Sequence, residues 1–539
     1  MALIYVFVAG ALISLLTTGF GRRMEELRRG RSLVIEQDHT VVLGWSDQVF
    51  TIVSELVEAN ANQRRGCVAI LADRDKVDME HDIRVKVGHT RGTRVVCRSG
   101  SPLDLDDLEL VNPVQARSII VPTQPGTDAD AHVVKTLLAV VNSSQRRNGQ
   151  PHHLIATVRD QRNAAAARLA GGPTAQVISA DDVAARLVAQ TSRQAGLSIV
   201  YTELLDFAGD ELYLAAEPRL TGHTFGDVLH NYRTSTVIGL LRGDGHVILN
   251  PPMDTELASS DQLIAISADD DTVIMAARAS QLREDLIAPA RVVSNPPEKI
   301  LILGWNRCAQ RILKLLDKYV ATGSVIHVVS SDPDSKHDVD QVAPGCTVDI
   351  EFTLGDTTDA EVLEMLGLDG FAHVIALCDE RLDPQQADSR TLITLLHLRD
   401  IADRLGIRVP VVSEMADDRN RALAPLTEAD DFIVSQKLIS LLMTQISENR
   451  HLADIFADLF SGEGAEIYLK PAQDYVVLGQ PVDFYTVTEA AQRRSEVAIG
   501  YRRHALASHA PQFGVTVNPD KQQMVTFQPG DRVVVLSAG

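Results

Sequence analysis

The feature that most constrains this chain is an internal duplication, in which short motifs return in the same order about 255–260 residues later. Six pairs of segments match: TVVLGW (40–45) with ILILGW (300–305), VAILADRD (68–75) with HVVSSDPD (327–334), GSPLD (100–104) with GDTTD (355–359), ARSIIV (116–121) with AHVIAL (372–377), VRDQRN (158–163) with MADDRN (415–420), and FAGDELYL (207–214) with FSGEGAEIYL (460–469). This spacing is far longer than the period of a solenoid. The chain is therefore predicted to contain two copies of one large unit.

Each copy alternates short β-branched runs with longer amphipathic stretches. In the first copy this pattern predicts strands at 40–44, 67–72, 94–97, 117–121 and 153–158, and helices at 48–59, 103–110 and 128–142. Strands that alternate with helices indicate βαβ crossovers and a parallel sheet, and continuously apolar strands indicate burial on both faces. Each copy then ends in short strands separated by Gly, Pro and Asp turns, closing with DQLIAIS (261–267) and DRVVVLS (531–537).

The predicted fold class is thus α/β, with tandem Rossmann-like lobes, each followed by a small α+β lobe, preceded by one transmembrane helix. The predicted boundaries are a membrane helix at 1–21, a juxtamembrane linker at 22–38, a first unit at 39–280 whose Rossmann lobe runs to about 205, a linker at 281–297, and a second unit at 298–539 whose Rossmann lobe runs to about 456.

The membrane helix is predicted from residues 2–20, which carry no charge and are long enough to cross a hydrocarbon core of about 30 Å. Five arginines follow within residues 22–31, which places the carboxyl side in the cytoplasm. A cleaved signal peptide and a buried core helix are the competing interpretations. The signal peptide lacks a charged region before its apolar run, and the length and basic flank fit a membrane span better than a core helix.

The overall charge argues against a nucleic-acid binder, because 51 basic and 72 acidic residues give −21. The five cysteines, with no CxxC pair, make a disulfide framework or a structural zinc site unexpected. No HExxH, GxSxG or Walker motif is present, so the chain is not expected to be an enzyme.

A nucleotide-type cleft is the first candidate site, at the carboxyl ends of the strands. Its candidate residues are the glycines and acidic residues that follow the first, second and third strands: Gly44, Asp73, Gly304, Asp332, Gly355 and Asp356. Only the first glycine of the dinucleotide fingerprint is present in copy one, and in copy two Asn306 replaces the second. NAD is therefore not expected as a cofactor, and a Rossmann fold used only as a scaffold remains the alternative.

Acidic clusters form the second candidate site, because calcium prefers several oxygen ligands. The residues chosen are Asp104 and Asp107 in copy one, and Asp332 and Asp334 in copy two. The competing interpretation is a solvated acidic surface.

Longer segments resemble a specific family. MEELRRGRSLVIEQDHTVVLGWSD (24–47), LADRDKVDMEHDI (71–83), VVCRSGSPLDLDDL (95–108) and ELYLAAEPRLTGHTFGDVL (211–229) are similar to the Castor/Pollux ion-channel family, from about residue 20 to the C-terminus. The resemblance implies two RCK domains per subunit, each a Rossmann lobe with a small lobe, in a tetrameric gating ring beneath a pore. It also implies potassium or calcium conduction and calcium as a ligand of the ring.

Family members carry further membrane helices and a pore region, whereas this sequence offers one span. The expected function is therefore a ligand-sensing gating-ring subunit of a potassium or calcium channel, anchored by its N-terminal helix in the cell membrane with its bulk in the cytoplasm. Self-association as a ring and a separate pore subunit are the expected partners. A NAD- or nucleotide-sensing regulatory subunit of a potassium transporter is the alternative.

Overall fold

The computed structural model describes residues 30–61, 66–126, 128–143, 151–276, 282–290, 296–420, 423, 431–460, 464–507 and 509–538. The predicted membrane helix at 1–21 lies outside these residues, as does the juxtamembrane segment up to residue 29. Across the described ranges, no helix is both long enough and apolar enough to cross a membrane.

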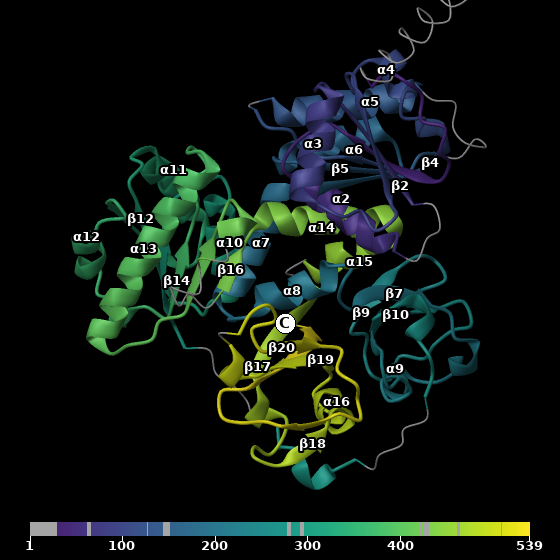
Figure 1. Cartoon of the computed structure of the whole chain (residues 1–539). Coiled ribbons are helices and arrows are strands. Elements are labelled where there is room, and N and C mark those ends of the chain that lie inside the picture. Colours follow the sequence, from purple (N-terminus) through teal and green to yellow (C-terminus); the bar gives the residue numbers. More distant parts are fainter. Residues whose placement is uncertain are drawn as a thin grey trace, which may run out of the picture. The chain divides into compact units, whose positions relative to one another are not determined.

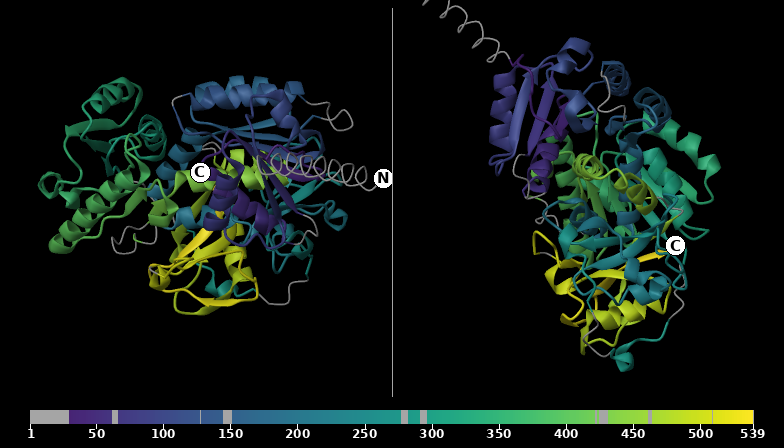
Figure 2. Two further views of the ribbon diagram at one scale, coloured as in Figure 1. Left: turned by 45° about the horizontal axis from the view of Figure 1, so that its top comes forward. Right: turned by 90° about the vertical axis from the view of Figure 1, so that its right-hand side faces the viewer.

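The first Rossmann lobe is a parallel sheet of six strands in the order β3-β2-β1-β4-β5-β6. The strands are β1 (His39–Leu43), β2 (Cys67–Ala72), β3 (Arg94–Ser99), β4 (Ala116–Val121), β5 (Leu154–Val158) and β6 (Ala175–Ser179). The helices are α2 (Gln48–Ala59), α3 (Lys76–Lys86), α4 (Leu105–Glu109), α5 (Ala129–Ser143) and α6 (Gln161–Gly171). Helices cover both faces of this sheet (Figure 2), so β1, β2 and β5 are buried along their whole length.

The second Rossmann lobe, green in Figure 1, repeats this topology with the order β13-β12-β11-β14-β15-β16. Its strands are β11 (Lys299–Leu303), β12 (Val325–Ser330), β13 (Asp349–Leu354), β14 (His373–Ala376), β15 (Val411–Glu414) and β16 (Asp431–Ile433). Its helices are α10 (Ala309–Tyr319), α11 (Asp334–Val342), α12 (Ala360–Met365) and α13 (Pro384–Leu405).

The two small lobes also share one topology, because β7-β10-β8-β9 corresponds to β17-β22-β19-β20. The first contains β7 (Glu211–Ala215), α9 (Phe225–Val228), β8 (Thr236–Leu241), β9 (Val247–Leu249) and β10 (Gln262–Ser267). The second contains β17 (Ala465–Pro471), β18 (Pro481–Asp483), α16 (Phe484–Gln492), β19 (Val497–Arg502), β20 (Val515–Val517), β21 (Met524–Thr526) and β22 (Arg532–Ala538). Both sheets are antiparallel, and each copy closes on the strand expected from DQLIAIS and DRVVVLS.

The duplication and the Rossmann-like α/β class are therefore confirmed in strand order as well as in sequence. The predicted strands and helices of the first copy agree with the structure to within a few residues at their ends. The pattern did not predict β6, α3 or α6. The apolar residues of α3 are few and mixed with charged ones, α6 consists largely of alanine and polar residues, and β6 is only five residues long.

The contacts group the chain differently from the sequence repeat, which placed the ends of the Rossmann lobes near 205 and 456. One compact unit extends to Ala180 and includes Ser440–Arg450, and the other comprises Asp181–Ile439 with His451 onward. Four helices follow the two sheets: α7 (Ala180–Ser192), α8 (Leu197–Leu205), α14 (Ser435–Glu448) and α15 (Leu452–Leu459). In the first unit, the end of α14 is bound to the first sheet. There, His153 Nε2 donates to the Ile446 carbonyl at 2.7 Å, and Arg117 pairs with Glu448 at 2.5 Å.

The predicted linker at 281–297 is partly integrated into the second small lobe. Leu286 is 6% exposed within the core of that lobe, and Ile287 forms a β-bridge with Val476. Residues 281 and 291–295 lie outside the described part of the chain.

Candidate functional site

A shallow pocket, open to solvent, lies in the second Rossmann lobe. It is formed where β11, β12 and β14 end and α13 begins. In such a sheet the chain reverses its strand order beside the first strand, and ligands bind at the carboxyl edge there. The lining residues are Leu303, Gly304, Trp305, Ser330, Ser331, Thr357, Ala376, Leu377, Asp379, Arg381, Ala387, Arg390, Thr391 and Thr394.

The turn after β11 is built around Gly304, whose φ is +91°. A Cβ at this position would lie 2.7 Å from the Leu377 carbonyl oxygen, so only glycine fits both the conformation and the space. Trp305 follows and is 8% exposed, with its Nε1 donating to Asp338 at 3.1 Å.

Two arginines at the pocket are bound to three carboxylates. Arg381 pairs with Asp332 at 2.6 Å and with Asp379 at 2.8 Å, and Arg390 pairs with Asp356 at 2.6 Å. The hydrogen bond from Arg381 lowers the pKa of Asp379. Burial alone would raise the pKa of Asp356, but its hydrogen bonds from Thr358 and Arg390 lower it overall. An anionic ligand could therefore replace these carboxylates as the partner of Arg381 or Arg390 at the rim of the pocket.

The candidate cleft residues of copy two come together at this pocket, each in a different way. Gly304 lines it directly, and Asp332 and Asp356 reach it through their ion pairs with the two arginines. Gly355 has a packing role, because a Cβ there would lie 2.9 Å from Val362 Cγ1.

In copy one the equivalent turn is occupied by a side chain of the protein. Gly44 has a φ of +118°, and a Cβ there would lie 2.5 Å from Gln124 Nε2. Asp73 is exposed after β2. Asp47, at the start of α2, makes no capping hydrogen bond and pairs with Lys86 at 3.2 Å. The second copy is therefore the better candidate for a ligand.

Three of the four candidate calcium ligands, Asp104, Asp107 and Asp332, have other partners in the structure. Asp104 caps α4 by accepting from the backbone of Asp106 and Asp107, and Asp107 pairs with Arg31 at 2.5 Å. Asp332 accepts from the backbone N–H of Asp334 at 3.1 Å. Within the described residues, no group of three or more His, Cys, Asp or Glu side chains is arranged to hold a metal ion. Calcium binding is not tested by these contacts and stays a prediction.

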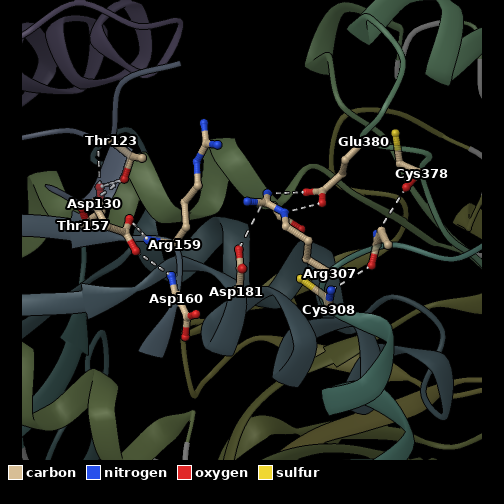
Figure 3. A network of polar contacts seen from close by, with 12 residues as sticks. Thr123, Asp130, Thr157, Arg159, Asp160, Asp181, Arg307, Cys308, Cys378 and Glu380 are labelled. Carbon is tan, nitrogen blue, oxygen red and sulfur yellow. Dashed lines mark hydrogen bonds and ion pairs between the residues drawn. The ribbon is translucent and has the colours of Figure 1, made fainter. Parts of the chain in front are cut away.

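A polar network extends from the Gly304 turn to α7 within the second unit (Figure 3). Arg307 lies between Glu380, at 2.7 Å, and Asp181 of α7, at 3.9 Å. Arg311 pairs with Asp182 on the same helix at 3.4 Å. The turn that forms the pocket is thus bound to a helix supplied by the first copy.

Sequence reasoning did not identify Arg381, Arg390 or Glu414 as members of this region. Their positions could have indicated two of them. Arg381 lies in the loop after β14, and Glu414 is the last residue of β15, so both lie at the carboxyl edge of the sheet, where ligands bind. Cys67, Cys97 and Cys378 are free thiols buried in the core.

Comparison with known proteins finds similar sequences along both copies. The model described as "Castor and Pollux, part of voltage-gated ion channel" matches residues 181–283, and that of the TrkA-N domain matches residues 300–435. Ion channel CASTOR of Lotus japonicus is 30% identical over 540 residues, which cover 92% of this chain and 62% of the relative. The probable ion channel POLLUX of Arabidopsis thaliana is 29% identical, over 99% of this chain and 68% of the relative.

Among solved structures, the human SLO3 gating ring is similar in fold. The TM-score is 0.65 at 13% sequence identity, over 92% of this chain and 98% of the ring subunit. These curated relatives are named as ion channels rather than enzymes. The chain spans about three fifths of the length of the CASTOR relatives that it matches. Along both copies the chain is therefore similar to ion channels of the Castor/Pollux family, and residues 181–283 match that family's own model.

Proposed function

We propose that this chain is the ligand-sensing gating-ring subunit of a cation channel, with potassium or calcium as the permeant ion. The observation that carries the proposal is the repeated architecture, in which two Rossmann lobes and two small lobes have matching strand orders, as in a gating-ring fold. The ion-channel names of the relatives support the same function. The pore is formed by further membrane segments or by a separate subunit.

The ring requires self-association, and the surface supports it. Equivalent helices of the two Rossmann lobes leave apolar side chains exposed. In the first lobe these are Leu105 on α4 and Leu138 on α5, and in the second they are Met365 on α12 with Ile393 and Leu396 on α13. Large exposed apolar faces commonly mark protein–protein contacts, and two similar but non-identical faces suit a closed ring. A tetramer is the proposed state.

The proposed anchor is the apolar segment at 2–20, with the bulk of the chain on the cytoplasmic side, as the arginines at 22–31 indicate. The ring then lies next to the membrane that contains the pore.

The proposed sensor is the pocket beside Gly304, because its turn is bound through Arg307 to α7. A ligand that binds one arrangement of this turn better than another shifts the ring between states. Calcium is the first proposed ligand, in keeping with the net charge of −21. Its proposed ligands are Asp332 and Asp334 in the second lobe, beside this pocket, and Asp104 and Asp107 at α4 in the first lobe. The second is a nucleotide such as NAD, as in a regulatory subunit of a potassium transporter, and the position of Arg381 and Arg390 favours it.

Thermal unfolding of the full chain in detergent separates the two ligands. A ligand at 100 times its dissociation constant stabilises the folded state by about 2.7 kcal/mol. We expect millimolar calcium to raise the Tm by several degrees, and NAD or magnesium to raise it less. Replacing the four aspartates by Asn should remove the calcium shift, whereas Asp254→Asn, at an exposed position in the first small lobe, should not.

A larger shift with NAD that is lost in Arg390→Gln would favour the nucleotide-sensing alternative. If neither calcium nor a nucleotide changes the Tm, the proposal of a ligand-sensing ring is contradicted.

A further inference from the structure

Glu414, the last residue of β15, is a carboxyl group buried in the second Rossmann lobe. The residue is 7% exposed. Its Oε2 accepts from Asn306 Nδ2 at 2.7 Å, and its Oε1 accepts from Ser435 Oγ at 2.9 Å. Both partners are neutral, and both are themselves buried.

No cation in the described part of the chain pairs with this carboxyl group. The nearby Arg307 is bound to Glu380 at 2.7 Å, and Lys437 is bound to Asp418 at 2.8 Å. Burial raises the pKa of Glu414 to about 7, and the negative charge of Glu380 adds to the shift.

The other titratable groups facing Glu414 do not offset this effect. Cys308 and Cys378 have pKa values raised by burial, so both thiols are neutral at physiological pH. The hydrogen bonds from Ser435, from Asn306 and from the backbone of Cys378 favour the ionised form only in part.

The first copy shows that the fold does not require a carboxyl group here. In the match of VRDQRN with MADDRN, Thr157 is the counterpart of Glu414. The Thr157 hydroxyl accepts from the Thr123 backbone N–H at 3.0 Å, and the Thr123 hydroxyl donates to the Thr157 carbonyl at 3.0 Å (Figure 3). A neutral pair thus holds the same position in the first lobe.

Asn306 connects the carboxyl group to the pocket turn. Its Nδ2 also donates to the Cys378 carbonyl at 3.3 Å, and its Oδ1 accepts from the Cys308 backbone N–H at 3.0 Å, just before α10 begins. Gly304 and Trp305 of the same turn line the pocket, and Arg307 is bound to Glu380 and Asp181.

The hydrogen bonds can serve both protonation states. An ionised Glu414 accepts from Asn306 and Ser435, whereas a protonated one donates its own O–H to the Ser435 oxygen, because a hydroxyl is both donor and acceptor. The ionised state places an unpaired negative charge beside Glu380 in a buried site, which disfavours the closely packed turn.

We propose that protonation and ionisation of Glu414 switch the Gly304–Cys308 turn between two conformations, which makes the second Rossmann lobe a proton sensor. The switch acts on the turn whether or not a ligand occupies the pocket, so it does not depend on the identity of that ligand.

Trp305 provides the test, because the chain contains only two tryptophans and Trp305 is next to Asn306. In the variant Trp45→Phe of the whole chain, Trp305 is the only tryptophan that fluoresces. Adding His337→Gln removes the titrating imidazole next in sequence to Asp338, which is the hydrogen-bond partner of Trp305. In this background we expect the emission to change between pH 5.5 and 8.5 with a midpoint of about 7. Adding Glu414→Gln should abolish the transition, and Glu414→Thr, which copies the first lobe, should do the same.

The same transition in a folded Glu414→Gln protein, or no transition in the Glu414 protein, would overturn the proposal. A second measurement does not depend on the variants folding. Infrared spectra of the wild-type chain labelled with ¹³C-glutamate should show a protonated carboxyl band that disappears with a midpoint of about 7, and its absence at pH 6 would equally overturn the proposal.

Discussion

At the scale of single residues, the duplication is visible in the hydrogen bonds of two aspartates. Asp130 on α5 accepts from the backbone of Arg159 and Asp160 and from the Asn163 amide, at 2.7–3.0 Å. Asp388 on α13 accepts from the backbone of Ala416 and Asp417 and from the Asn420 amide, at 2.7–3.0 Å. Each carboxylate thus fixes the turn after the fifth strand, which explains why VRDQRN and MADDRN are similar.

Lys521 is the second residue with an unusual environment, because it is 1% exposed and the described residues place no carboxylate within ion-pair distance of its ammonium group. It donates to the Ser235 carbonyl and to Thr236 Oγ1, which joins the second small lobe to the first. Burial lowers its pKa to about 7, and the charge of Asp520 offsets this only in part.

The lowered pKa predicts a pH-dependent stability. Between pH 7 and the unfolded value of 10.5 the unfolded chain binds the proton and the folded chain does not, so stability rises with pH over this window. Lys521→Met removes this dependence. We expect the free energy of unfolding of the wild type, relative to that of the variant, to increase by about 1 kcal/mol or more from pH 6.5 to pH 9.5. Denaturant unfolding at the two pH values measures it, with Lys336→Met, an exposed helix residue, as the control. An unchanged difference would mean that Lys521 stays charged in the folded chain.

The sequence could predict some site residues and not others for a physical reason. Gly304 and Asp332 were found because their positions follow from the strand order. Arg381 and Arg390 were missed because an ion pair depends on where a loop and a helix bring a long side chain. Glu414 was missed because nothing in a local pattern separates a buried carboxyl group at a strand end from an exposed one.

At the scale of elements, the strands were predictable because they are continuously apolar and spaced by helices. The packing partners of α7 and α14 were not predictable, because an amphipathic pattern indicates that a helix packs on one face but does not indicate which sheet it packs against. In the structure the end of α14 joins the first unit, and α7 is bound to Arg307 and Arg311 in the second.

The exposed helix faces yield a prediction about assembly. Burying a leucine or methionine side chain contributes about 1.5–3 kcal/mol, so charges at these positions should weaken association at least tenfold. The variants are Leu105→Asp with Leu138→Asp in the first lobe, and Met365→Asp with Ile393→Asp in the second. Sedimentation over a concentration series measures the loss. Met524→Asp, at an equally exposed apolar residue of the second small lobe, is the matched control, and an equal loss there would argue against the helix faces.

At the scale of the whole molecule, the apolar N-terminal segment predicts membrane attachment. The full chain should stay with membranes during high-salt and carbonate washes, because about 19 uncharged residues embed too much apolar surface to be released. A variant that lacks residues 2–20 should be released under the same conditions. Release of the intact chain by carbonate would contradict the anchor.

The central claim is that the chain forms a ring, and the mass of the particle tests it most directly. Light scattering or native mass spectrometry of the full chain in mild detergent, at micromolar concentration, gives this mass. The account predicts a particle with four times the 58.7 kDa of one chain. A strictly monomeric particle at every concentration would contradict it.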